Sequence, residues 1–180
     1  MLTLSERQVF VAGSIAPTGK SLSLAQDIGD PVARPYSFDD MADAFEEQIR
    51  GLLEGGADIL LLETCFDALN TKAAIYALRR IPEAADVPVM ISASLSDKSG
   101  RTLTGQTMEA FYRSVSHASP LSFGLNCSLG ARDMIPLVAD VSSWTEAAVS
   151  CHPNAGLPNE MGEYDEAPED TAAAIREMAL

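Results

Sequence analysis

The sequence predicts an α/β fold in which helices cover a parallel sheet. Two observations point to this class. Short apolar runs alternate with amphipathic stretches along the whole chain, and no linker or shift in composition interrupts the alternation. The hydrophobic content of 47% is enough to bury a core. We therefore expect a single domain over residues 1–180.

Five apolar runs are expected to form the strands of this sheet. The run ADILLLET is continuous in apolar residues and too short for a core helix, which is typical of a strand covered on both faces. The others have similar length and are bounded by polar or turn-forming residues. The expected strands are residues 9–15, 57–64, 88–95, 121–127 and 147–152.

The first two helices are marked by residues suited to their ends. Ser37 with Asp40 three residues later predicts a capping box, and Gly55–Gly56 ends the helix that follows. Asp67 is expected to cap the next helix rather than to act as a catalytic acid. That helix stops at Pro82.

Three further helices complete the alternation. Thr107 is expected to cap the third helix. A fourth begins at about residue 133, with Pro136 in its first turn, where no amide hydrogen bond is lost. The last covers residues 170–180.

The number of strands leaves two parallel architectures open. A closed (β/α)₈ barrel needs eight strands and typically about 250 residues. Five strands of a barrel would leave two open edges, whereas a five-stranded doubly wound sheet would be complete by itself. Length alone therefore favours the doubly wound sheet.

Composition excludes several classes of partner. The net charge of −14, from 26 acidic and 12 basic residues, argues against nucleic acid and anionic membranes. No apolar run reaches the roughly 18 residues of a membrane span, and MLTLSERQVF lacks the features of a signal peptide. Three cysteines without paired spacing do not form a disulfide framework. A reducing, cytoplasmic location is expected.

The segment GSIAPTGKS has the wrong spacing for a phosphate-binding loop. Gly13 and Gly19 are separated by five residues instead of four, and Pro17 lacks an amide that such a loop would use. The sequence also contains no G-x-G-x-x-G motif. Nucleotide binding is therefore not expected.

Candidate functional residues follow the expected strands, where parallel α/β folds carry their sites. Glu63 ends the second strand, and a carboxylate there is costly to bury unless it is paired or binds a cationic ligand. Cys65, Cys127, Cys151 and His152 also lie at strand ends. They are either inert packing residues or ligands of a catalytic zinc ion, which takes three protein ligands and keeps an open position. A cysteine nucleophile would need His152 as its base, and the loop at 152–159 is a candidate pocket wall.

Several segments resemble, in order and spacing, the homocysteine S-methyltransferase family, in particular the homocysteine-binding module of cobalamin-dependent methionine synthase. The resemblance extends over about residues 9–180. The segments that carry it are VAGSIAPTGK, GADILLLETCFDALNTKAA, MISASLSDKSGRTLTGQT, FGLNCSLG and HPNAGLPNEMGEYDE.

The resemblance implies a (β/α)₈ barrel, of which this chain would supply about strands three to seven. It implies a zinc ion held by three cysteine thiolates, one of them Cys127 in the G-x-N-C motif. It also implies that Glu63, Asn126 and Ser128 bind homocysteine, with Glu63 receiving the amino group and the backbone at Ser128 holding the carboxylate. The zinc-bound thiolate would take methyl from methylcobalamin, which methyltetrahydrofolate recharges on separate modules.

The sequence also departs from the family pattern. It contains no GGCCG motif, which carries the family's other two zinc cysteines, and the first barrel strand is missing. We therefore expect a partial barrel that is inactive alone and needs the missing strands and the folate and cobalamin modules as partners. Three alternatives remain: a rebuilt zinc site from Cys127 with Cys151, His152 or Cys65; a non-catalytic remnant that binds partners through its open sheet edges; and betaine or S-methylmethionine as methyl donor.

Overall fold

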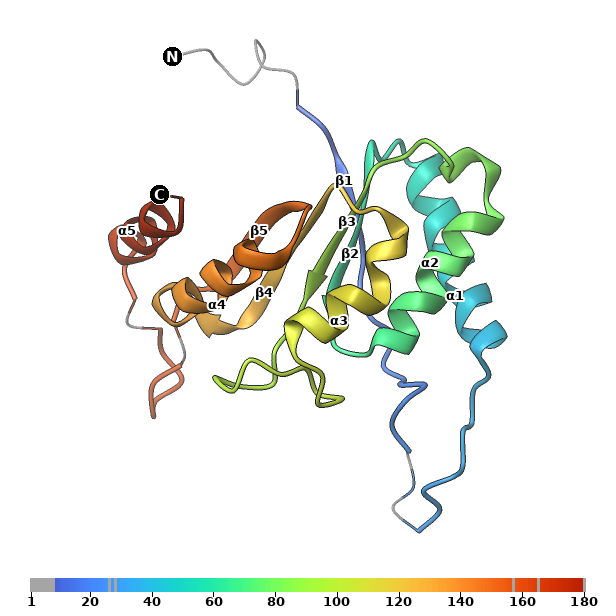
Figure 1. The fold of residues 1–180 in the computed structure, drawn as a ribbon, viewed down its shortest axis with the longest axis horizontal. Helices are drawn as coiled ribbons and strands as arrows, with labels where there is room; N and C mark the ends of the chain where they lie inside the picture. The colour runs from blue at the N-terminus through green and yellow to red at the C-terminus, as the bar shows by residue number, and fades with distance from the viewer. Residues whose placement is uncertain (1–8, 26, 28, 157, 165, 180) are drawn as a thin grey trace.

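The computed structural model contains one parallel sheet of five strands, with helices between them (Figure 1). It describes residues 9–25, 27, 29–156, 158–164 and 166–179. Residues 1–8, most of the segment inspected for a signal peptide, lie outside the described residues, as does residue 180 at the end of the last expected helix. The strands are β1 (Ala12–Ile15), β2 (Ile59–Cys65), β3 (Val89–Ala93), β4 (Ser122–Gly130) and β5 (Ala148–Asn154). The helices are α1 (Phe38–Glu54), α2 (Ala68–Arg80), α3 (Met108–Val115), α4 (Ala131–Trp144) and α5 (Pro168–Met178), with 3₁₀ turns at Pro82–Ala84 and Ser116–Ala118.

The order of the strands identifies the sheet as part of a barrel. Each strand pairs in parallel with its neighbours in sequence, so the order is β1-β2-β3-β4-β5 without a reversal. Contacts between α1 and α2, α2 and α3, α3 and α4, and α4 and α5 place successive helices side by side in one layer. A doubly wound sheet reverses its strand order and carries helices on both faces. The doubly wound sheet that chain length alone favoured was therefore the wrong expectation. Within the described residues, β1 and β5 are open edges.

Strand register separates an outer face, which packs on the helices, from an inner face. Side chains alternate between the two faces, so residues paired across parallel strands share a face. One row of paired residues forms the core under the helices: Ile15, Leu62, Ile91, Phe123 and Val149. The adjacent row faces the interior of the incomplete barrel: Ser14, Leu61, Met90, Ser122 and Ala148.

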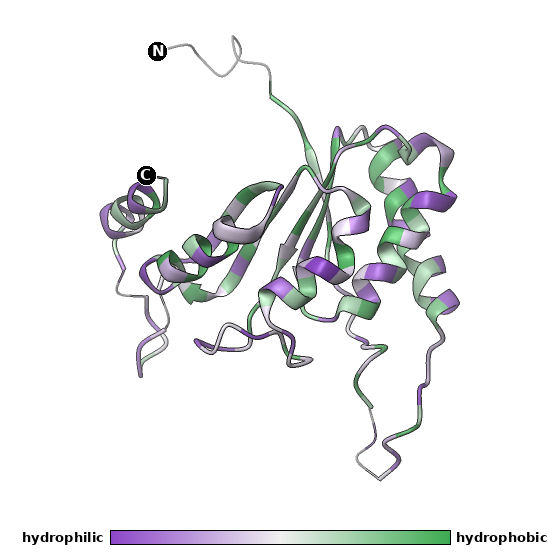
Figure 2. Ribbon diagram, in the orientation of Figure 1, coloured by the Kyte–Doolittle hydropathy of each residue, from purple (hydrophilic) through white to green (hydrophobic). Residues whose placement is uncertain are grey.

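The caps expected from the sequence are confirmed. Ser37 and Asp40 form a reciprocal capping box, and Gly56 adopts a φ of 84° after the last turn of α1. Asp67 accepts a hydrogen bond from an amide in the first turn of α2, and Thr107 does the same for α3. Figure 2 shows hydrophobic and hydrophilic residues alternating around these helices. None of the helices in the described part of the chain has the length and hydropathy needed to cross a membrane.

The start of α4 differs from the expectation. Strand β4 continues to Gly130, which is the N-cap, and the helix begins at Ala131. Pro136 is consequently the sixth residue of the helix, not a first-turn residue, and the carbonyl of Arg132 lacks its usual amide partner. Strand β5 also runs further than expected, to Asn154.

Gly124 is fixed by the close approach of β4 to β5. A β-carbon at Gly124 would overlap the backbone oxygen and the hydroxyl oxygen of Ser150, which pairs with it in register. Because the backbone itself blocks this space, no side-chain rotation can relieve the overlap. The glycine of the G-x-N-C motif therefore has a packing role.

The Gly124→Ala substitution should lower the free energy of unfolding by about 2–3 kcal/mol, the upper range for overpacking a core. Urea denaturation followed by circular dichroism measures this change. Gly51→Ala is the matched control, since Gly51 is exposed in α1 and a β-carbon there meets nothing within 4 Å. The control should raise stability by about 0.5–1 kcal/mol. Equal effects at the two positions would contradict the packing role.

Candidate functional site

The side-chain amide of Asn126 lies at the centre of a hydrogen-bond network on the inner face. Its Oδ1 accepts from the Thr64 amide at 3.0 Å and from the Ser92 hydroxyl at 2.7 Å. Its Nδ2 donates to Thr64 Oγ1 at 2.8 Å and to Cys127 Sγ at 3.4 Å. The network joins the carboxyl ends of β2, β3 and β4, and both hydrogen-bonding atoms of the amide have two partners.

Three non-glycine residues in or next to this network have left-handed backbone conformations. Thr64 has a φ of 57°, Cys127 of 50° and Ser128 of 67°. Such conformations cost about 1–3 kcal/mol each and persist where neighbouring groups hold them. For a β-branched residue such as threonine the conformation is especially rare. The strand registers shift at the same places, between Leu62 and Cys65 in β2 and after Asn126 in β4.

The Cys127 thiol has polar surroundings. Its Sγ lies 3.2 Å from Ser94 Oγ, and the residue is partly exposed. Ser94 Oγ is also 2.9 Å from Ser128 Oγ, which donates to the carbonyl of Leu95 at 2.6 Å. A cysteine that only fills space would be packed against apolar groups. The contacts of the Cys127 thiol are therefore polar, unlike those of a cysteine packed in the core.

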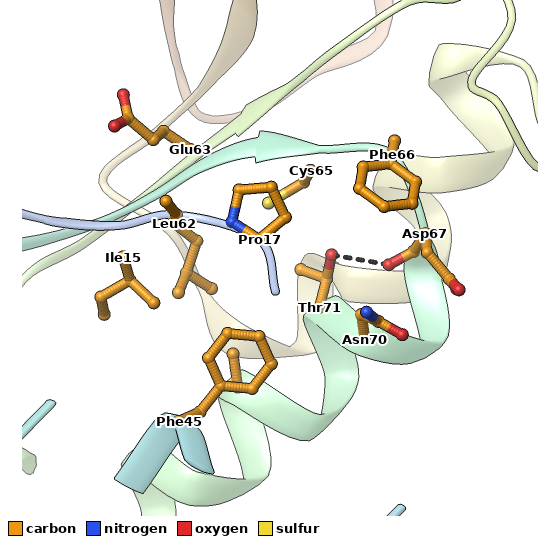
Figure 3. A pocket seen from close by; sticks show the side chains of 12 residues that line it. Ile15, Pro17, Phe45, Leu62, Glu63, Cys65, Phe66, Asp67, Asn70 and Thr71 are labelled. Carbon is orange, nitrogen blue, oxygen red and sulfur yellow. Dashed lines mark hydrogen bonds between the residues drawn. The ribbon is translucent and has the colours of Figure 1, made fainter. Parts of the chain in front are cut away.

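The Glu63 carboxylate lies on the inner side of β2. Figure 3 shows it across the strand from Leu62 and Cys65. It accepts a hydrogen bond from the hydroxyl of Ser14 on β1. The side chain is partly exposed, so a ligand in the barrel interior can reach it.

The other two cysteines point away from Cys127. Burial raises the pKa of the Cys65 thiol to about 12, and Cys151 Sγ lies 3.4 Å from Met134 Sδ of α4, where burial also raises its pKa. His152 is exposed and pairs with Asn126 in register, on the inner face. Among the described residues, no group of three or more His, Cys, Asp and Glu side chains could hold a metal ion. The described side chains considered above for a rebuilt zinc site are thus not grouped around Cys127.

A small cavity of about 20 Å³ lies on the opposite side of β2, beneath α1 and α2 (Figure 3). It has room for about one water molecule, and its lining is mostly apolar, including Phe45, Leu62 and Ala74. It is a gap in the core between sheet and helices. The Asn126 network lies on the other face of the sheet.

Asp67 is saturated by hydrogen bonds. One carboxylate oxygen accepts from the Ser23 amide at 3.0 Å and from the Ser21 hydroxyl; the other accepts from the Leu69 amide at 2.9 Å and the Ser23 hydroxyl at 2.7 Å. Burial alone would raise the pKa of Asp67, but these hydrogen bonds outweigh it and hold the pKa below its usual range. Asp67 caps α2, as expected, and it also anchors the loop after β1.

The fold is an arc of a parallel barrel, and its polar site lies at the carboxyl ends of the strands, where barrel enzymes carry their active sites. The family model described as homocysteine S-methyltransferase matches residues 3–179. The chain therefore belongs to the homocysteine S-methyltransferase family, which confirms the family resemblance.

Solved structures of the homocysteine methyltransferase MmuM from Escherichia coli are similar to this chain. The apo form matches with a TM-score of 0.69 and 19% identity over 96% of this chain and 65% of that chain. The metallated form matches with a TM-score of 0.62 and 22% identity over 92% of this chain and 54% of that chain. The likeness confirms the fold, and the chain spans less than two thirds of either structure.

Four residues of the site were not singled out from the sequence: Ser14, Thr64, Ser92 and Ser94. In the sequence, small polar residues within apolar strands cannot be distinguished from ordinary strand residues. For Ser14 and Ser92 a signal was present, because alternation places them on the same face as Glu63 and Asn126. Nothing in the sequence marks the left-handed conformation of Thr64, because threonine rarely adopts it.

The Asp67→Asn substitution should lower the free energy of unfolding at neutral pH by about 1–3 kcal/mol. Each carboxylate oxygen accepts a fixed backbone amide, so an asparagine NH₂ would face one of these donors. Urea denaturation measures the change, with the exposed Asp86→Asn as control.

The same pair of variants tests the pH dependence. The folded-state pKa of Asp67 is depressed, so its stabilisation is complete above the unfolded pKa of about 3.9 and is lost as pH falls through the folded value. The difference between the original chain and Asp67→Asn should therefore shrink in acid. A difference that stays constant down to the acid transition would contradict this assignment.

Proposed function

We propose that this chain forms the homocysteine-binding part of a homocysteine S-methyltransferase of the methionine synthase type. The observation that carries the proposal is the placement of the Glu63 carboxylate and the Cys127 thiol at one rim of the barrel, linked through Thr64 and Asn126. Homocysteine carries an ammonium group and a sulfur two carbons further along its chain. A carboxylate is the natural partner for the ammonium group, since charge-assisted hydrogen bonds are the strong ones.

Cys127 is proposed as one ligand of the zinc ion that the family resemblance implies. The described residues supply only this thiol on the inner face near the network, so they do not form a complete zinc site. The remaining ligands would have to come from outside the described residues. Zinc bound there would hold the homocysteine sulfur as a thiolate.

The substrate carboxylate is proposed to bind near Ser128. Helix α4 begins three residues later, at Ala131, and its N-cap Gly130 makes no side-chain capping hydrogen bond. The first amides of a helix and its dipole favour an anion at this end. The binding groups then fit the three polar parts of homocysteine: Glu63 for the ammonium, Cys127 for the sulfur and the backbone near Ser128 for the carboxylate.

The proposed reaction transfers a methyl group to the homocysteine sulfur. A sulfur–carbon bond forms as the bond between the methyl carbon and its donor breaks, and the electron pair of that bond leaves with the donor. We propose methylcobalamin as donor, on a separate module, because the segments at 100–107 and 152–165 resemble the cobalamin-dependent branch. Assays of the full-length protein with methylcobalamin, betaine or S-methylmethionine distinguish the donors.

Three free thiols are consistent with a cytoplasmic location.

The Glu63→Gln substitution should weaken homocysteine binding at least tenfold, as expected for loss of one charge-assisted hydrogen bond. Isothermal titration calorimetry at a fixed zinc concentration measures this. Binding of 4-mercaptobutanoate, which is homocysteine without its amino group, should change little. The exposed Glu54→Gln serves as control. Equal weakening of both ligands by Glu63→Gln would show that Glu63 does not bind the ammonium group.

A further inference from the structure

We propose that Asn126 is a positioning residue, which holds Thr64 in its left-handed conformation and thereby fixes the place of Glu63 relative to Cys127. This inference rests on the proposed function where it assigns Glu63 and Cys127 to the amino group and sulfur of homocysteine. It replaces the expectation that Asn126 itself touches the substrate. The observation that carries it is that the side-chain amide of Asn126 forms two hydrogen bonds with Thr64, one with its backbone amide and one with its hydroxyl.

The first argument is that the Asn126 amide has no hydrogen-bonding capacity left for a substrate. Its oxygen accepts from the Thr64 amide and the Ser92 hydroxyl, and its nitrogen donates to Thr64 Oγ1 and Cys127 Sγ. An amide oxygen has two lone pairs and the NH₂ group has two hydrogens, so all four positions are used. Asn126 is 8% exposed, which also leaves little surface for contact.

The second argument concerns the conformation of Thr64. Asn126 binds both the backbone amide and the hydroxyl of Thr64, and this two-point contact fits only one orientation of the residue. Without it, a threonine would return to negative φ, because its β-branched side chain disfavours the left-handed region. Glu63 directly precedes Thr64, so this rotation would redirect the strand end that presents its carboxylate.

The third argument is that Asn126 is itself held from a third strand. Ser92 on β3 is 1% exposed and donates its hydroxyl hydrogen to Asn126 Oδ1 at 2.7 Å. Asn126 on β4 thus connects Thr64 on β2 with Cys127 on β4, and Ser92 on β3 holds the Asn126 side chain in place. The separation between the ammonium and sulfur sites is therefore set by hydrogen bonds within the protein, not by the ligand.

The test is the ratio of affinities for homocysteine and 4-mercaptobutanoate, measured by calorimetry on the full-length protein at a fixed zinc concentration. The original chain should prefer homocysteine at least about tenfold, as for one charge-assisted contact. Asn126→Ala should reduce the preference to within about twofold while the thiol ligand still binds. In the double variant Asn126→Ala/Thr64→Gly, a preference above about threefold should return, because glycine adopts positive φ without strain.

Two further variants keep the inference falsifiable. Ser92→Ala removes only the brace and should give an intermediate preference, which covers the case in which Asn126→Ala fails to fold. Ser122→Ala is the matched control, since its buried hydroxyl lies on β4 and has no hydrogen-bond partner among the residues that the structure describes. The control should keep the preference of the original chain. If Asn126→Ala keeps the full preference, or if Thr64→Gly restores none of it, Asn126 does not act through Thr64 and the inference is overturned.

Failure of the proposed function has a different signature. If the original chain does not prefer homocysteine, the assignment of Glu63 fails, and amide hydrogen exchange then decides the positioning role. Exchange of the Thr64 amide should accelerate at least about tenfold in Asn126→Ala, stay unchanged in Ser122→Ala, and accelerate less in Ser92→Ala. Unchanged exchange in Asn126→Ala would overturn the inference.

Discussion

The parallel pairing of each strand with its neighbour in sequence is the constraint on which the rest of this structure depends. It brings the carboxyl ends of all five strands to one rim, and its register decides which face each side chain joins. Cys65 at the end of β2 and Cys151 within β5 face the helices, where burial raises the pKa of both thiols, whereas Cys127 within β4 faces the interior of the barrel. The face of the sheet, rather than the position along the strand, therefore separates Cys127 from the other two cysteines.

The alternation of side chains between the two faces of the sheet is interrupted at the site, because the backbone there leaves the extended conformation. Thr64, Cys127 and Ser128 adopt left-handed conformations where the strand registers shift. At these two irregular segments, one at Thr64 and one at Cys127 and Ser128, the strand leaves regular pairing. The neighbouring side chains can therefore point in directions that a regular strand would not allow. Asn126 contacts both segments, through Thr64 on β2 and through Cys127 on β4, its own strand. One buried amide therefore links the two strained segments.

Much of the fold was predictable because local chemistry determines it. Ser37, Asp67 and Thr107 cap their helices as polar N-cap residues do. The strand order was not predictable from residue periodicity, since the same alternation of strands and helices serves a barrel and a doubly wound sheet. The family resemblance supplied that choice. At the site, Glu63 and Cys127 stand out by residue type, whereas the contacts of Asn126 with Thr64 join residues 62 positions apart, which no local pattern reveals.

Two carboxylates four residues apart show how hydrogen bonding separates structure from function. Both oxygens of Asp67 accept a backbone amide, and a backbone amide cannot turn away to admit a ligand. Its depressed pKa therefore reflects its structural role. Glu63 has the hydroxyl of Ser14 as its partner, and a hydroxyl rotates freely and can also accept a hydrogen bond. An incoming ammonium group can therefore bind Glu63 without breaking a backbone contact. Of the two carboxylates, Glu63 is the one held by a side-chain hydroxyl instead of backbone amides, which supports the substrate-binding role proposed for it.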